Sequence, residues 1–362
     1  MSRRPAESGW ADSPGQGDRV PGDRVPAGLA LLNVRRLLDD EVVASFRLAP
    51  GDQALATAGE RVAAGAALAA RLWDAAVQEA ARPGRIGGIV RTQAAGAEPG
   101  ERWGAGASHR GEPERVGEHL FEIGGRWRVA AGEIGESLEA PFDGVVAGVR
   151  AGMHVTLRST ARGLHAAFAL GGPVRGRLEL AASAGGELRA SAIDVGRAGE
   201  ILVVGARIDA EALTRARAMG VRGVVVGGLP SKEQRDFLAS EARQRAARQR
   251  LPPFAVLVLD GPMRRPIASP IMAILAALAG RQVAIVGNPP VLAFDDATLE
   301  LPLPPPDLVR IRSGPLLGTE GRWAGLAGMR RFAGGVHLEA GLVEAADGLV
   351  TAIPLGDLER FA

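Results

Sequence analysis

Two glycine-containing turns are the segments of this chain best suited to chemistry, because each follows an apolar strand and precedes a helix. They are VVGARID at 203–209 and VVGGLPSKE at 225–233. Backbone amides at a helix N-terminus can bind phosphate or another anion, and α/β sheets usually bind ligands at the carboxyl ends of their parallel strands. The pattern predicts a small-anion site with six candidate residues: Gly205, Arg207, Gly227, Gly228, Ser231 and Lys232. In the alternative interpretation, the glycines only form turns and Ser231 only caps a helix.

Signals for catalysis or metal binding are sparse. None of the five histidines falls in an HExxH frame, and the chain has no GxSxG elbow and no P-loop. His154 and His165 can approach each other across a hairpin near Asp143, but isolated surface or strand histidines are the favoured interpretation, because metal sites need several converging ligands. The absence of cysteine excludes disulfides, thiolate nucleophiles and Cys-ligated metals. We therefore expect no catalytic residues and no metal, which favours a binding protein over an enzyme.

Composition limits the partners. The 362 residues carry a formal net charge of +2, and the only lysine is Lys232. Aromatic residues make up 4% of the chain, which argues against an RNA surface built from stacked aromatic rings. The longest apolar stretch, at 270–280, is about half the length needed to span a bilayer. We expect a cytoplasmic protein with no membrane partner.

Three folded parts are expected to position these residues, which gives a multidomain α/β plus all-β fold class. Residues 1–28 are rich in Gly, Pro and Arg and predict a disordered arm, with a short binding arm as the alternative. Residues 29–195 predict a β domain with an exposed loop at about 92–115 and one helical stretch at 71–81.

Buried-strand runs alternate with helices over 196–300 and predict a small α/β domain with a parallel sheet. Its four expected strands begin near 200, 221, 253 and 282, and Ser231 is the expected N-cap of the second helix. A proline-rich linker at 301–306 leads to a small β-barrel at 307–362.

The motifs of the first part resemble the biotinyl/lipoyl-like barrel-sandwich hybrid fold. Residues 51–68 and 140–155 resemble its two quasi-symmetric hairpins, GD…GE…GAAL and AP…DGV. Attachment of biotin or lipoate requires a lysine at a hairpin tip, and this region has none, so we expect neither cofactor. The α/β part resembles DRTGG-type regulatory domains over 201–229, although Gly205, Ala206 and Arg207 stand where that family has a Gly-Asp-Arg-like segment.

The last part resembles a KOW-type SH3-like barrel. It reproduces the pattern V-x-I-x-x-G-P-x-x-G-x-x-G, with Gly321 expected at the tight turn between the first strands and 353–361 as the closing strand. KOW barrels contact RNA or protein, so the resemblance implies a surface for structured RNA or a protein complex. The candidate contact residues are Arg310, Arg312, Arg322, Arg330 and Arg331, which would need to share one face.

Three function hypotheses remain at this point. The first is a non-enzymatic binding or scaffold protein whose KOW-like barrel contacts a protein complex or structured RNA. The second is a sensor or enzyme for a nucleotide or small anion, centred on the α/β domain, where Asp209 and Glu233 are the nearest carboxylates. The third is a purely structural role, in which the domains are assembly surfaces without a ligand.

Overall fold

The computed structural model describes residues 28–48, 52–79, 116–123, 126–150, 153–246, 252–295 and 299–362. Strands dominate these residues, together with three α-helices. This mixture of α/β and β architecture agrees with the sequence prediction at that level. The predicted loop at 92–115 and the predicted arm at 1–28, apart from Gly28, lie outside the described residues.

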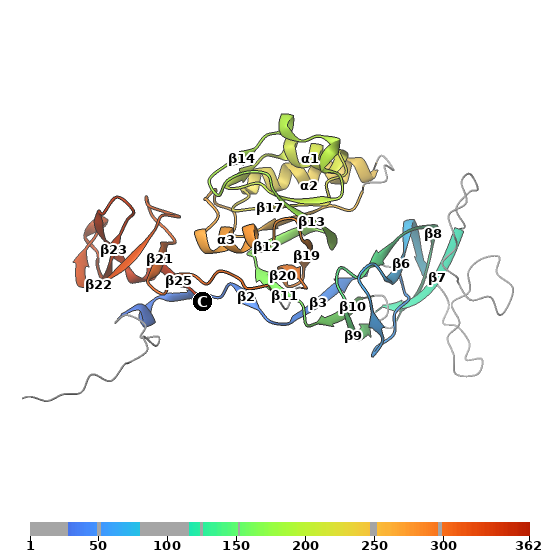
Figure 1. Ribbon diagram of the computed structural model, residues 1–362. Helices are drawn as coiled ribbons and strands as arrows, with labels where there is room; N and C mark the ends of the chain where they lie inside the picture. Colours follow the sequence, from blue (N-terminus) through green and yellow to red (C-terminus); the bar gives the residue numbers. More distant parts are fainter. Residues whose placement is uncertain are drawn as a thin grey trace, which may run out of the picture.

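A nine-stranded sheet forms the centre of the molecule (Figure 1). Its strands β13, β15, β17 and β18 are parallel neighbours, and the other neighbouring pairs are antiparallel. Across the sheet the order is β12 (Phe168–Gly171), β18 (Ala255–Val258), β17 (Gly223–Val226), β15 (Glu200–Val203), β13 (Val174–Leu180), β19 (Gln282–Gly287), β20 (Pro290–Phe294), β11 (Arg162–His165) and β2 (Leu38–Asp39).

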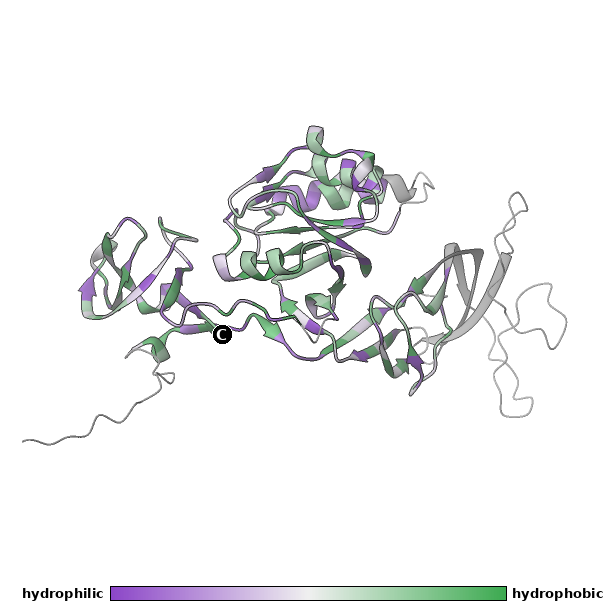
Figure 2. Ribbon diagram, in the orientation of Figure 1, coloured by the Kyte–Doolittle hydropathy of each residue, from purple (hydrophilic) through white to green (hydrophobic). Residues whose placement is uncertain are grey.

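Helices cover both faces of this sheet. Helices α1 (Ala210–Ala218) and α2 (Ser231–Ala246) share one core with Leu202 of β15, and α3 (Ser269–Ala277) shares the other with Ile201. Successive strand residues point to opposite faces, so a strand covered on both sides is apolar throughout. Figure 2 shows the resulting hydrophobic strands between the helices.

Two details of this part correct the sequence prediction. Strand β19 was expected to extend the parallel sheet, but it runs antiparallel to β13. A strand buried on both faces has the same apolar pattern in either direction, so its direction depends on the connection. Ser231 is the first residue of α2 rather than its N-cap, and the Pro230 carbonyl accepts from the Gln234 amide at 3.0 Å.

Two four-stranded sheets hold most of the N-terminal strands. Their cores continue into β19 and β20 through Val286 and Val291. The two expected hairpin motifs meet, because β5 pairs with β9 and the Ala64 amide donates to Asp143 Oδ1 at 2.7 Å. The orders are β3 (Val42–Arg47), β10 (His154–Ser159), β9 (Gly144–Arg150), β5 (Arg61–Val62), and β4 (Gln53–Ala54), β6 (Ala67–Glu79), β8 (Arg126–Glu139), β7 (Val116–Ile123).

The helix expected at 71–81 is wrong. The described part of this stretch belongs to β6, which pairs antiparallel with β8 from Ala67 opposite Glu139 to Glu79 opposite Arg128. Pairing along the whole length of a neighbouring strand outweighs the local helical pattern of alanines and charged residues.

The C-terminal sheet has six strands and includes a strand from near the start of the chain. The order is β1 (Asn33–Arg35), β25 (Leu358–Phe361), β21 (Leu308–Ile311), β22 (Glu320–Arg331), β23 (His337–Glu344) and β24 (Val350–Pro354). Strand β1 is parallel to β25. Leu29 and Leu32, beside β1, pack into the same core as Val309 and Trp323. The structure therefore distributes the segment 29–195 over several sheets, with β1 in the C-terminal sheet and β2, β11, β12 and β13 in the central one.

Gly321 does not lie at the turn expected from the KOW pattern. It is inside β22, where an added Cβ would lie 2.5 Å from the Glu344 carbonyl oxygen on β23. The turn between β21 and β22 instead contains Gly314 and Gly318, both with positive φ. Because Gly321 has no side chain, the neighbouring strand β23 can approach closely at this position.

Candidate functional site

The six predicted ligand residues lie at the carboxyl ends of β15 and β17, but neighbouring backbone covers the glycines. An added Cβ at Gly205 would lie 2.3 Å from the Ser183 oxygen. At Gly227 and Gly228 it would lie 2.4 Å from the Arg265 oxygen and 1.9 Å from the Met263 oxygen. Gly205 therefore allows close packing of residues 183–186, and Gly227 and Gly228 allow close packing of the loop between β18 and α3.

The protein's own carboxylates occupy the N-terminus of α1. Asp209 accepts from the Ala212 amide at 2.7 Å, and Glu233 accepts from the Ala210 amide at 3.0 Å. They fill the position that an external anion would take. Arg207 lies 3.9 Å from Glu187, and the exposed Lys232 ammonium lies 3.2 Å from Asp236. The structure thus gives these candidates internal partners.

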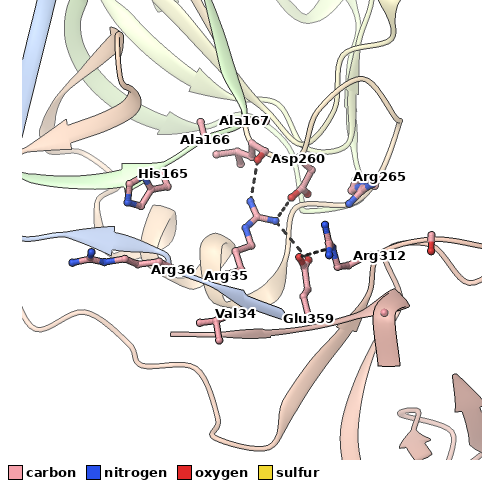
Figure 3. A pocket seen from close by; sticks show the side chains of 13 residues that line it. Val34, Arg35, Arg36, His165, Ala166, Ala167, Asp260, Arg265, Arg312 and Glu359 are labelled. Atoms are coloured by element: carbon pink, nitrogen blue, oxygen red, sulfur yellow. Dashed lines mark hydrogen bonds and ion pairs between the residues drawn. The ribbon is translucent and has the colours of Figure 1, made fainter. Parts of the chain in front are cut away.

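A different cleft opens at the carboxyl end of β18, between the central sheet and the C-terminal sheet (Figure 3). Its volume is about 600 Å³, within the usual range for small-molecule sites. Separate segments of the chain contribute its lining, so the cleft exists only in the folded chain. The lining residues are Val34, Arg35, Arg36, His165, Ala166, Ala167, Leu259, Asp260, Arg265, Arg312, Ser313, Gly356 and Glu359.

Asp260 follows β18 and anchors the inner wall of this cleft. Its carboxylate is fully buried and pairs with Arg35 of β1 and, at 2.9 Å, with Arg310 of β21. Arg310 is also fully buried and donates to the Pro266 carbonyl at 2.6 Å. Arg35 donates to the Leu259 carbonyl at 3.0 Å. These contacts join the central sheet to two strands of the C-terminal sheet.

Glu359 of β25 is the second carboxylate of the network. Its oxygens lie 3.8 Å from Arg35 Nη1, 4.0 Å from Arg310 Nη1 and 3.6 Å from Arg312 Nε. The side chain is only 10% exposed, and its Oε1 has no hydrogen-bond partner within the part of the chain that the structure describes. A buried acceptor of this kind is costly unless something donates to it.

Arg265, on the loop after β18, has no hydrogen bond and no ion pair within 4 Å among the described residues, and its Nε is buried. Burial lowers the pKa of its guanidinium, and the Arg310 and Arg35 charges add to this effect, whereas the Asp260 and Glu359 carboxylates oppose it. The two carboxylates thus face four guanidinium groups, those of Arg35, Arg265, Arg310 and Arg312, which leaves two positive charges in excess.

His165 lines the cleft beside Arg36. Its Nε2 lies 2.9 Å from Asp39 Oδ2, and Arg36 Nη2 lies 3.3 Å from Asp39 Oδ1. Asp39 belongs to β2, so this group sits on the side of the cleft formed by the central sheet. His154, the other histidine of the predicted hairpin pair, lies on β10 opposite Arg47 and Arg150. In the described parts of the chain, no three His, Asp or Glu side chains are arranged to hold a metal ion.

The five arginines predicted as a contact face do not share one. Arg310 is wholly buried, which corrects its assignment to a surface, and Arg312 lines the cleft. Arg322 is exposed and pairs with Asp307 at 2.9 Å, which raises the pKa of its guanidinium. Arg330 and Arg331 are adjacent on β22 and so point to opposite faces.

Sequence reasoning missed Arg35, Asp260, Arg265 and Glu359. One signal was present: Asp260 ends a buried apolar strand in VLVLDG, the same position that Gly205 and Gly227 hold after their strands. No comparable local signal marks the arginines, since their positions in the sequence are far apart.

Comparison of the chain with protein-family models finds no match, and comparison with curated proteins finds none. Within the described ranges, no helix combines the length and the apolar character needed to cross a bilayer.

Proposed function

We propose that this chain is a non-enzymatic binding protein that holds a small anionic ligand in the cleft at the carboxyl end of β18. The observation that carries the proposal is Arg265, a half-buried guanidinium with no hydrogen bond or ion pair within 4 Å among the described residues, in a cleft with two excess positive charges. The carboxyl end of a parallel strand is also where α/β sheets usually bind ligands. The proposal keeps the small-anion hypothesis from the sequence and moves its site from 205–232 to the edge at Asp260.

Binding is favoured over catalysis because both cleft carboxylates are engaged by arginines. Asp260 pairs with Arg35 and Arg310, and Glu359 lies near three guanidinium groups. Carboxylates so held position the arginines of the cleft.

The test is calorimetric titration with phosphate, sulfate, acetate and succinate at constant ionic strength. Arg265→Gln is expected to weaken binding of the best anion about ten- to a hundredfold, since a hydrogen bond to a charged group contributes about 1.5–3 kcal/mol. Arg264→Gln is the matched control, because Arg264 is its exposed neighbour and does not line the cleft. Equal binding by the two variants would refute the proposal.

A second candidate function concerns the C-terminal sheet, which we propose as a KOW-like barrel that contacts a protein partner. Met329, Val336 and Leu338 are exposed on or beside the hairpin of β22 and β23, with Met329 opposite Glu339 and Leu338 opposite Arg330. Met329 and Leu338 therefore place apolar side chains on the two faces of this hairpin. Exposed apolar side chains favour a protein surface over RNA. We likewise propose a barrel-sandwich hybrid for the N-terminal strands, which the meeting of the two hairpin motifs at Ala64 and Asp143 supports.

Isolation of the tagged protein from its native host, with and without RNase, tests the second candidate. We expect an RNase-resistant protein partner that Met329→Asp abolishes and Leu303→Asp retains, since Leu303 is even more exposed but lies in the linker before β21. Partners lost on RNase treatment would instead support an RNA-contacting barrel.

A further inference from the structure

We infer that the ligand of the cleft is a phosphate monoester of a small polyhydroxylated molecule, such as a sugar phosphate. This inference rests on the proposed function and names the chemical class of the ligand. Four properties of the cleft support the inference: its net charge, the arrangement of its hydrogen-bond donors, its volume and its unpartnered hydrogen-bond acceptor.

The charge of the cleft matches a dianion. Four guanidinium groups face two carboxylates, so two positive charges remain uncompensated. A phosphate monoester carries between one and a half and two negative charges near neutral pH, because its second pKa is about 6. A ligand with a single carboxylate carries one negative charge, so it would leave one positive charge of the cleft uncompensated.

The free donors suit a tetrahedral group. Arg265 and Arg312 approach the cleft from separate segments, one from the loop after β18 and the other from the end of β21 (Figure 3). All donors of Arg265 are free of described partners, and the only described side-chain interaction of Arg312 is the Nε pairing with Glu359. One arginine fork already occupies both oxygens of a carboxylate, whereas three terminal phosphate oxygens can accept from two forks.

The rest of the cleft holds more than a phosphate ion. Its volume of about 600 Å³ is that of a site for an organic molecule. Val34, Ala166, Ala167 and Leu259 supply small apolar contacts, and no Phe or Trp is among the lining residues. The lining therefore suits the C–H groups of a small aliphatic molecule, and it provides no Phe or Trp ring on which a nucleobase could stack.

Glu359 identifies the second polar feature of the ligand. Glu359 lines the cleft with a side chain that is nine-tenths buried, and no described group donates a hydrogen bond to its buried Oε1. A ligand hydroxyl can donate to this oxygen, whereas a phosphate oxygen cannot. The site therefore combines two arginines for the phosphate with one carboxylate for a hydroxyl.

The test compares ligands rather than variants, so it does not depend on altering the buried network. Calorimetry on the full chain would measure glycerol phosphate, ribose phosphate and glucose phosphate against propyl phosphate, inorganic phosphate, sulfate and succinate. We expect the best polyol phosphate to bind at least about tenfold more tightly than propyl phosphate, which lacks the hydroxyls. We also expect its affinity to fall between about pH 7 and pH 5, as the phosphate gains a proton, while sulfate shows no matching loss.

The outcomes separate this inference from the proposed function. Equal affinity for propyl and polyol phosphates would overturn the hydroxyl contact to Glu359, and tightest binding of sulfate or succinate would overturn the phosphate assignment. In both cases, loss of that binding in Arg265→Gln would still uphold an anion-binding cleft. If no anion shows Arg265-dependent binding, the proposed function and this inference both fail.

Discussion

Replacing Arg310 with methionine is expected to destabilise the junction between the central and C-terminal sheets by about 3 kcal/mol. Removing one partner of a buried ion pair typically costs about 3–5 kcal/mol, because the other charge stays buried. Asp260 keeps its pairing with Arg35, which places the loss at the lower end of that range. The substitution also leaves the Pro266 carbonyl without the donor that lies 2.6 Å away.

Urea unfolding followed by circular dichroism would measure this loss, and hydrogen exchange of the β21 and β25 amides would locate it. Arg322→Met, one strand away, is the control, because Arg322 is exposed and its pairing with Asp307 is solvated. We expect faster exchange in β21 and β25 for Arg310→Met and almost no change for Arg322→Met. A loss below about 1 kcal/mol for Arg310→Met would refute the view that this buried pair holds the two sheets together.

Two further predictions concern the central sheet. Gly228→Ala is expected to lower the free energy of unfolding by about 1–3 kcal/mol, because the added methyl group would meet the Met263 carbonyl. Gly172→Ala is the control, because an added methyl group there has open space. Equal melting temperatures for the two variants would contradict this prediction. A hydrogen bond with Glu179, followed by burial, raises the pKa of Glu200, so the folded chain keeps a proton that the unfolded chain has released. Stability should therefore fall as pH rises from the ordinary pKa of glutamate through the raised one, and urea midpoints of Glu200→Gln should lose this fall.

The sequence predicted the central elements because each is encoded locally. The run from Glu200 to Val203 is apolar enough to be buried on both faces, and Asp209 accepts from the amide of the following helix as an N-cap should. Strands such as β1 and β12 could not be predicted in the same way. They have three and four residues and are defined by partners far along the chain.

The cleft was less predictable than the fold for a related reason. The glycines at 205, 227 and 228 lie between a strand and a helix, where an anion can bind, but in the structure they let neighbouring backbone pass closely. Asp260 was visible as a carboxylate after a strand. Arg35 and Arg312 reach the same cleft only because β1 and β21 join the same sheet, and no local sequence pattern predicts that arrangement.

The pairing of β1 with β25 imposes an order on biosynthesis. Asn33 lies opposite Glu359, and the Leu37 amide donates to the Ala362 carbonyl at 2.8 Å, so β1 cannot pair until β25, some 320 residues later, has emerged from the ribosome. At about 5–20 residues per second, this wait lasts tens of seconds. During that time the side chains of Leu29 and Leu32 lack the core into which they pack in the folded chain, so they are available to a chaperone. The arginine cleft is complete only after β25 has been made, since Glu359 belongs to that strand.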